Sequence, residues 1–275
     1  MLAGAFSSAV ATLLGAFFVF AGILVYVTLI RQIGVRRAAL PLEPGPVPPR
    51  TFGLPEGLLA TVLTLFMLMN ISASFQRHAP IQLTERDLIA NLLLTVFIVC
   101  FVAAFLKLRG IDMDAVAGLS KWSLKRALST ATVLLLAAAP LIILAEVLTQ
   151  NAFGGGSSRQ EIVDLFTNSR TITQRVLIIV LAVVVAPICE EFIFRFFIYG
   201  VLRRYFGIAL ALVFNSLLFA AAHTHLPSAT PLFVLGGCFT LAFEWSGSIL
   251  VSMGMHALFN SVQLVFLAFP ELFQQ

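Results

Sequence analysis

Long uninterrupted runs of apolar residues are the dominant pattern along the chain. Windows of about 19 residues identify candidate spans near residues 5–30, 53–75, 88–106, 127–149, 176–202, 205–222, 231–244 and 248–269. The alternation of apolar and polar positions that marks a transmembrane β-barrel is absent from these runs. Helices are then the structure that satisfies every backbone group in lipid. The pattern therefore predicts an all-α fold, a polytopic transmembrane helix bundle of about eight spans.

The composition narrows the class of protein further. The chain is 60% hydrophobic and 11% charged, so it has more apolar surface than one soluble core of this length can bury. Its formal net charge is +4, but the basic residues lie in loops and at span ends and form no patch with interleaved aromatic residues. The lipid bilayer is therefore a predicted partner, and nucleic acid is not.

The basic residues are divided unequally between the two sides of the predicted bundle. If the spans alternate in direction, one side holds Arg31, Arg36, Arg37, Arg50, Lys107, Arg109, Lys121, Lys125, Arg126, Arg203 and Arg204. The other side holds Arg77, Arg86, Arg159, Arg170 and Arg175. Cytoplasmic loops carry the excess of Lys and Arg. The charges therefore predict that both termini lie outside the cytoplasm.

A charged cluster interrupts an apolar stretch. Glu190, Glu191 and Arg195 follow residues 176–186, which include no polar side chain, and charge at that depth costs about 2.5 to 3.5 kcal/mol per group. Such a cluster indicates a functional site. Glu191 and Arg195 are an i, i+4 pair with the glutamate first, which favours an ion pair. We therefore expect Arg195 to neutralise Glu191 as a structural pair, and Glu190 to face a cavity as a general base.

Two further polar groups follow: His223, and His256 with Asn260. If the fifth and sixth spans form a hairpin that turns near Phe206, Glu190 and His223 both lie about 24 Å from the turn at 1.5 Å per residue. They then share a depth in the membrane. His256 and Asn260 lie on one face of the last helix. We expect His223 to share a proton with Glu190 around a water molecule, and His256 and Asn260 to form an oxyanion hole.

Three motifs thus occur in order on the late spans. They are Glu-Glu-x-x-x-Arg at residues 190–195, Phe-x-x-x-His at residues 219–223 and His-x-x-x-Asn at residues 256–260. The trio resembles the motifs of the CPBP family of intramembrane endopeptidases, which includes the CAAX proteases, also called type II CAAX prenyl endopeptidases, and bacteriocin-processing enzymes. The resemblance covers about residues 176–265.

The resemblance implies a role for each motif residue. In the family, the residues that match Glu190 and His223 activate water, and those that match His256 and Asn260 stabilise the oxyanion. The implied substrate is a peptide or a lipidated protein, for example a prenylated one. The implied location is the plasma membrane of a prokaryote.

Only the C-terminal part of the chain carries the motifs. We therefore divide it into residues 1–175, transmembrane helices and loops of unassigned role, and residues 176–270, a catalytic core. The hairpin places the site far from Arg203 and Arg204, and hence towards the non-cytoplasmic face by charge. Processing of prenylated proteins in the family uses a cytoplasmic opening instead.

No cofactor is predicted, because the best-placed donors are divided between base and oxyanion roles and no dedicated ligand spacing is present. The alternative is a zinc site formed by His223, His225, His256 and a glutamate. His225, which precedes Leu226, is expected at the membrane surface.

Two other classes of function remain open. A non-catalytic membrane scaffold or a bacteriocin-immunity protein keeps the same fold, and cleavage of a peptide by purified protein distinguishes it from an enzyme. A proton-coupled transporter uses buried glutamate and histidine residues as a relay. Its inverted repeats are not seen, because the first four spans lack counterparts of the motifs. The peptidase is the main hypothesis.

Other polar residues are interpreted as structural. Asn215 is expected to make an interhelical hydrogen bond rather than to orient the catalytic histidine. Glu146 and Glu244 lie near span ends and are expected to be solvated. Asn70 and Asn91 are assigned to packing and lipid contact.

Overall fold

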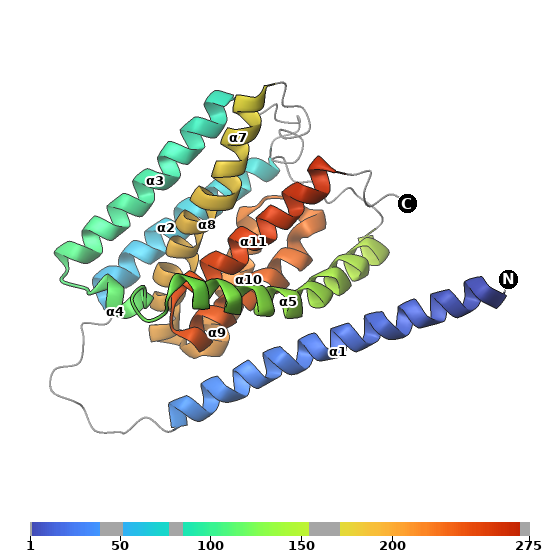
Figure 1. The fold of residues 1–275 in the computed structure, drawn as a ribbon. Coiled ribbons are helices and arrows are strands. Elements are labelled where there is room, and N and C mark those ends of the chain that lie inside the picture. The colour runs from blue at the N-terminus through green and yellow to red at the C-terminus, as the bar shows by residue number, and fades with distance from the viewer. Residues whose placement is uncertain (1, 39–51, 77–84, 154–170, 270–275) are drawn as a thin grey trace.

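The protein is described by a computed structural model of residues 2–38, 52–76, 85–153 and 171–269 (Figure 1). Every regular element within these residues is helical. The α-helices are α1 (Leu2–Ala38), α2 (Leu54–Phe75), α3 (Glu85–Leu108), α4 (Met113–Ala117), α5 (Leu124–Phe153), α7 (Ile172–Val180), α8 (Ala186–Glu191), α9 (Tyr199–Ala222), α10 (Ala229–Ser246) and α11 (Ile249–Ala268). Shorter elements are the π-helical segments η1 (Leu181–Val185) and η2 (Phe192–Ile198) and the 3₁₀ turn η3 (Leu226–Ser228). The predicted all-α fold is confirmed.

Seven stretches of the described chain are long and apolar enough to cross a membrane. One of them, Ile172–Ala222, has 51 residues. A straight helix of that length would measure about 76 Å, against about 30 Å for the hydrocarbon core. The chain turns back within it at Gly207, where φ is 75° and ψ is 175°, and the rings of Phe194 and Phe219 on either side of the turn are 5.3 Å apart. The stretch is therefore a hairpin of two passes, which confirms the turn predicted near Phe206.

Replacing Gly207 by alanine is expected to lower the free energy of unfolding by about 1 to 3 kcal/mol, because this backbone conformation is almost confined to glycine. A Cβ atom at Gly207 would meet no atom within 4 Å, so the loss comes from the backbone and not from a clash. Reversible unfolding of the purified protein in detergent measures it. Gly34→Ala is the matched control, since Gly34 also has open space but a helical backbone. An equal loss in both variants would contradict the strain at Gly207.

Helix α10 is the centre of the bundle, and α1, α5, α9 and α11 pack around it. Its close contact with α9 depends on a missing side chain, because a Cβ atom at Gly236 would lie 3.0 Å from the ring of Phe219 and 3.4 Å from Cα of Ser216. Between α1 and α5, the hydroxyl of Tyr26 donates to the carbonyl oxygen of Leu134. Small residues and interhelical hydrogen bonds are common means of association in membranes. The resulting hydrophobic core contains residues of the segment 1–175 as well as residues of the segment 176–270.

One end of the bundle gathers basic residues. Arg36 donates to the carbonyl oxygen of Trp245 at 2.8 Å, which places the C-terminal end of α1 beside that of α10. Arg203, close to the hairpin turn, pairs with Glu244 at 3.0 Å, so the turn lies at the same end. The charge bias predicts that this end is cytoplasmic. The N-terminal end of α1 and the C-terminal end of α11 lie towards the opposite side (Figure 1).

The prediction that Glu244 is a solvated span end is wrong. Its side chain is 5% exposed, and it accepts a hydrogen bond from the hydroxyl of Tyr199 at 2.9 Å in addition to its pairing with Arg203. The physical reason is the central position of α10, where the neighbouring hairpin covers the carboxylate and supplies its partners. Glu146 is partly exposed and accepts a hydrogen bond from Gln150 at 2.7 Å.

Candidate active site

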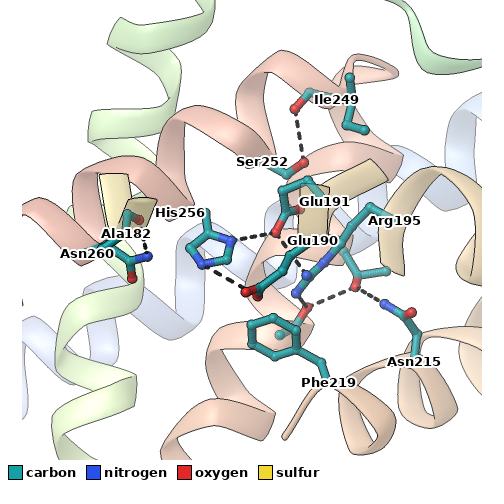
Figure 2. A network of polar contacts seen from close by, with 12 residues as sticks. Ala182, Glu190, Glu191, Arg195, Asn215, Phe219, Ile249, Ser252, His256 and Asn260 are labelled. Atoms are coloured by element: carbon teal, nitrogen blue, oxygen red, sulfur yellow. Dashed lines mark hydrogen bonds and ion pairs between the residues drawn. The ribbon is translucent and has the colours of Figure 1, made fainter. Parts of the chain in front are cut away.

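The two adjacent glutamates have different partners. Glu191 and Arg195 form an ion pair at 2.9 Å, and both side chains are fully buried. His256 brings its Nδ1 atom to 2.9 Å from the same oxygen of Glu191. Glu190 is 28% exposed, and its carboxylate lies 3.9 Å from Nε2 of His256, so His256 lies between the two glutamates (Figure 2). The predicted pairing of Glu191 with Arg195 is confirmed.

Aromatic rings surround the guanidinium group of Arg195. Its Cζ atom lies 4.2 Å from the ring centre of Phe219, 5.1 Å from that of Phe239 and 5.8 Å from that of Phe194. A hydrogen bond to the carbonyl oxygen of Gly236 adds a contact at 3.4 Å. A cation is attracted to aromatic faces, most strongly where water is excluded. These contacts offset part of the desolvation cost of the buried charge.

Hydrogen-bond partners decide which ring nitrogen of each histidine is free. Nδ1 of His223 lies 2.8 Å from the carbonyl oxygen of Phe219. A carbonyl oxygen only accepts, so Nδ1 carries the hydrogen and Nε2 is left free. By the same argument, the carboxylate of Glu191 places a hydrogen on Nδ1 of His256, whose Nε2 then faces Glu190. The ring of Phe219 contacts both histidine rings, with centres 4.7 Å away for His223 and 6.0 Å away for His256.

A cavity of about 430 Å³ adjoins these residues. Glu190 lines it from α8, and His223 lines it from the C-cap of α9. The predicted shared depth of Glu190 and His223, and the orientation of Glu190 towards a cavity, are confirmed. The opposite walls come from α2 and α3 and include Asn70 and Asn91. Both are exposed side chains that line the cavity, and their assignment to packing and lipid contact stays a prediction.

The stretch that contributes Glu190 and His223 to this cavity is similar to known proteases. Residues 172–262 match the family described as type II CAAX prenyl endopeptidase Rce1-like. The chain is also 30% identical over 89 residues to the membrane-embedded CAAX protease MroQ of Staphylococcus aureus (strain USA300). That alignment covers 30% of this chain and 36% of the relative. Residues 172–262 therefore resemble the CAAX proteases of the CPBP family. No solved structure matches it.

The CPBP motif residues do not all reach the cavity. Asn260 donates to the carbonyl oxygen of Ala182 in η1 at 2.7 Å and is not among the residues that line the cavity. His256 is almost completely buried behind Glu190. The oxyanion roles of His256 and Asn260 therefore stay predictions. The motif helix α8 is flanked by the π-helical segments η1 and η2, and π-helical turns are frequent at functional sites.

Two polar residues near the CPBP motifs have structural partners. Asn215 donates to the hydroxyl of Thr240 at 3.1 Å, which confirms the interhelical hydrogen bond. Nδ1 of His225 lies 2.8 Å from the hydroxyl of Ser228, and His225 does not line the cavity. Within the described ranges, no three His, Cys, Asp or Glu side chains form a group that could hold a metal ion.

Proposed function

We propose that the chain is an intramembrane endopeptidase that hydrolyses a peptide bond of a membrane-associated or lipidated protein. The observation that carries the proposal is that Glu190 and His223 line one cavity among apolar helices. Titratable side chains at such positions are rare and are usually functional. The similarity to CAAX proteases supports the same class of reaction.

Activation of water is the central step. Glu190 removes a proton from a water molecule in the cavity, and the water oxygen attacks the carbonyl carbon of the peptide bond. The free Nε2 atom of His223 holds the same water from its own wall and shares the proton. When the carbon–nitrogen bond breaks, the proton passes to the amine of the leaving peptide, and the attacking oxygen remains in the new carboxyl group.

His256 is the proposed donor to the developing oxyanion. This role requires a hydrogen on Nε2 of His256 as well as on Nδ1, which lies 2.9 Å from Glu191. A fixed N–H donor in a site from which water is excluded stabilises the transition state far more than it would in water.

Cleavage by the purified chain tests the proposal. The protein is placed in lipid vesicles with membrane-bound peptides, half of which carry a prenyl group, and new peptide ends are identified by mass spectrometry. We expect cleavage by the unmodified chain and none by His223→Ala. Cleavage of prenylated peptides alone would identify a lipidated substrate. A folded chain that binds these peptides but cleaves none would overturn the proposal in favour of a scaffold.

Proteolytic activity is expected to survive removal of divalent metal ions. In a zinc mechanism, His223 and His256 would be ligands, but within the described residues no three His, Cys, Asp or Glu side chains form a group that could hold a metal ion. His225 lies outside the cavity. The measurement is the cleavage rate after treatment with a chelator and after addition of zinc. Loss on chelation and recovery with zinc would establish the metal alternative.

A further inference from the structure

The cavity that holds Glu190 and His223 is completed by helices outside the segment that matches the CAAX proteases. We propose that α2 and α3 form the subsite that selects the substrate. In this subsite Asn70 and Asn91 bind the backbone of the substrate peptide, and an apolar floor accepts one of its side chains. The inference rests on the proposed function, because the peptide must lie against Glu190.

On α2, the lining residues form one stripe. Leu63, Met67, Asn70 and Ser74 all line the cavity, and their spacing of three or four residues places them on one helix face. The stripe begins with apolar residues and ends with polar ones. The cavity wall on this side therefore changes from apolar to polar along the helix.

On α3, a second stripe runs in the opposite direction. Asn91, Leu94, Thr95 and Ile98 line the cavity at the same kind of spacing. Here the polar residues come first and Ile98 last. The polar part of each stripe thus lies towards the C-terminal end of α2 and the N-terminal end of α3.

An ion pair fixes the register of the two stripes. Arg109, just after α3, binds Glu56 in the first turn of α2 at 3.0 Å. At 1.5 Å per residue, Met67 and Ile98 both lie about 16 Å from this pair, and Asn70 lies about 21 Å from it. By the same rise, Thr95 also lies about 21 Å from the ion pair, level with Asn70. Ser74 and Asn91 both lie about 27 Å from it. Apolar residues therefore oppose apolar ones, and polar residues oppose polar ones.

This arrangement fits an extended peptide. A peptide held for cleavage exposes backbone N–H and C=O groups, and unpaired groups of this kind are costly away from water. An asparagine amide offers both a donor and an acceptor. One N–H of Asn70 donates to the carbonyl oxygen of Phe66 at 2.8 Å, and its oxygen and second N–H remain for the peptide. Leu63, Met67 and Ile98 then form the floor for a large apolar side chain.

Peptide capture by Glu190→Gln protein tests the subsite separately from catalysis. A degenerate peptide library in vesicles is exposed to the immobilised protein, and the retained peptides are sequenced. We expect enrichment of peptides with leucine or phenylalanine over those with alanine. Adding Met67→Trp should reduce this enrichment about tenfold, because it fills the floor with an indole ring. Adding Asn70→Leu should weaken retention of all peptides about fivefold, the effect of one lost hydrogen bond.

Met69→Trp is the matched control for Met67→Trp. Met69 belongs to the same helix but is 72% exposed and does not line the cavity, so enrichment should be unchanged. The subsite would be overturned if Glu190→Gln protein enriched peptides with leucine or phenylalanine equally with and without Met67→Trp. It would also be overturned if no peptide were retained. Selective retention by a chain that never cleaves would support the subsite and refute the proposed protease activity.

A different observation concerns Asn260. We infer that Asn260 is a positioning residue, which acts through the backbone of η1. The N–H of Ala186 donates to the carbonyl oxygen of Leu181, five residues earlier. In this π register the carbonyl oxygen of Ala182 would accept from residue 187, but Pro187 has no N–H. The amide of Asn260 supplies the missing donor at 2.7 Å.

The hydrogen bond ties α11 to the start of the helix that carries Glu190. Pro187 and Glu190 belong to the same short helix, α8, so the position of Glu190 depends on the turn that Asn260 holds. Asn260→Ala should therefore lower kcat about a hundredfold, the effect of a small displacement of a catalytic group. KM should change little, because Asn260 does not line the cavity.

Restoring the backbone donor distinguishes this role from an oxyanion role. Pro187→Ala supplies an N–H for the carbonyl oxygen of Ala182, so the double variant Pro187→Ala with Asn260→Ala should recover most of the lost kcat. Pro187→Ala alone should stay close to the unmodified chain. If Asn260→Ala does not fold, the double variant should still fold and cleave. A double variant as slow as Asn260→Ala, or one that does not fold, would overturn the inference.

Discussion

Replacing Glu190 by glutamine is expected to lower kcat by about a hundred- to ten-thousandfold, the range that a general base contributes. Glutamine keeps the shape of the side chain but cannot take a proton from water. Folding should be unaffected, because Glu190 makes no ion pair as short as that of Glu191 and is partly exposed to the cavity. Steady-state cleavage of a membrane peptide, together with thermal unfolding in detergent, measures both effects.

Glu146→Gln is the matched control for Glu190→Gln. Glu146 is also a glutamate of a membrane span, but it is bonded to Gln150 on α5 and does not line the cavity of Glu190. Its replacement should leave kcat within about threefold. Full activity of Glu190→Gln would remove Glu190 from the mechanism.

Replacing Glu191 by alanine is expected to destabilise the protein by about 3 to 5 kcal/mol, the usual result of removing one partner of a buried ion pair. The variant leaves Arg195 without its carboxylate among three phenylalanine rings. It also removes the partner of Nδ1 of His256. Equilibrium unfolding in detergent gives the change in free energy.

A double variant provides the control for Glu191→Ala. Glu191→Leu with Arg195→Met replaces the ion pair by apolar side chains of similar volume, a change that is often neutral or stabilising in proteins. It should be more stable than Glu191→Ala, although it does not restore a partner for His256. A Glu191→Ala protein that unfolds normally but does not cleave would show that the two glutamates have exchanged roles.

Relations within one helix or across one turn could be predicted from the sequence. The spacing of Glu191 and Arg195 fixes their common face, and equal distances from the turn at Gly207 bring Glu190 and His223 to one cavity. Both relations follow from the constant rise and twist of a helix. Little other information is needed to predict that Glu190 and His223 meet, because the bilayer keeps each pass of the hairpin helical.

Relations between distant helices could not be predicted in this way. The placement of Asn70 on the cavity wall depends on how α2 packs against the hairpin, and no periodicity in either helix specifies that contact. Glu244 fails for the same reason, since its partner Arg203 comes from a neighbouring helix. In the sequence, Pro187 is a local sign that a backbone N–H donor is missing beside η1. The donor that replaces it is on α11, which the sequence near η1 does not indicate.

The pairing of Glu191 with Arg195 inside one hairpin has a consequence for biosynthesis. Translation completes this hairpin before α10 and α11 exist, so its guanidinium enters the bilayer already compensated by a carboxylate four residues away. A partner on a later helix would leave an uncompensated charge during insertion, which the bilayer strongly disfavours. His256, in contrast, joins Glu190 only when the last helix is inserted. A nascent chain that lacks this helix therefore carries the hairpin in the membrane with Glu190 but without His256 beside it.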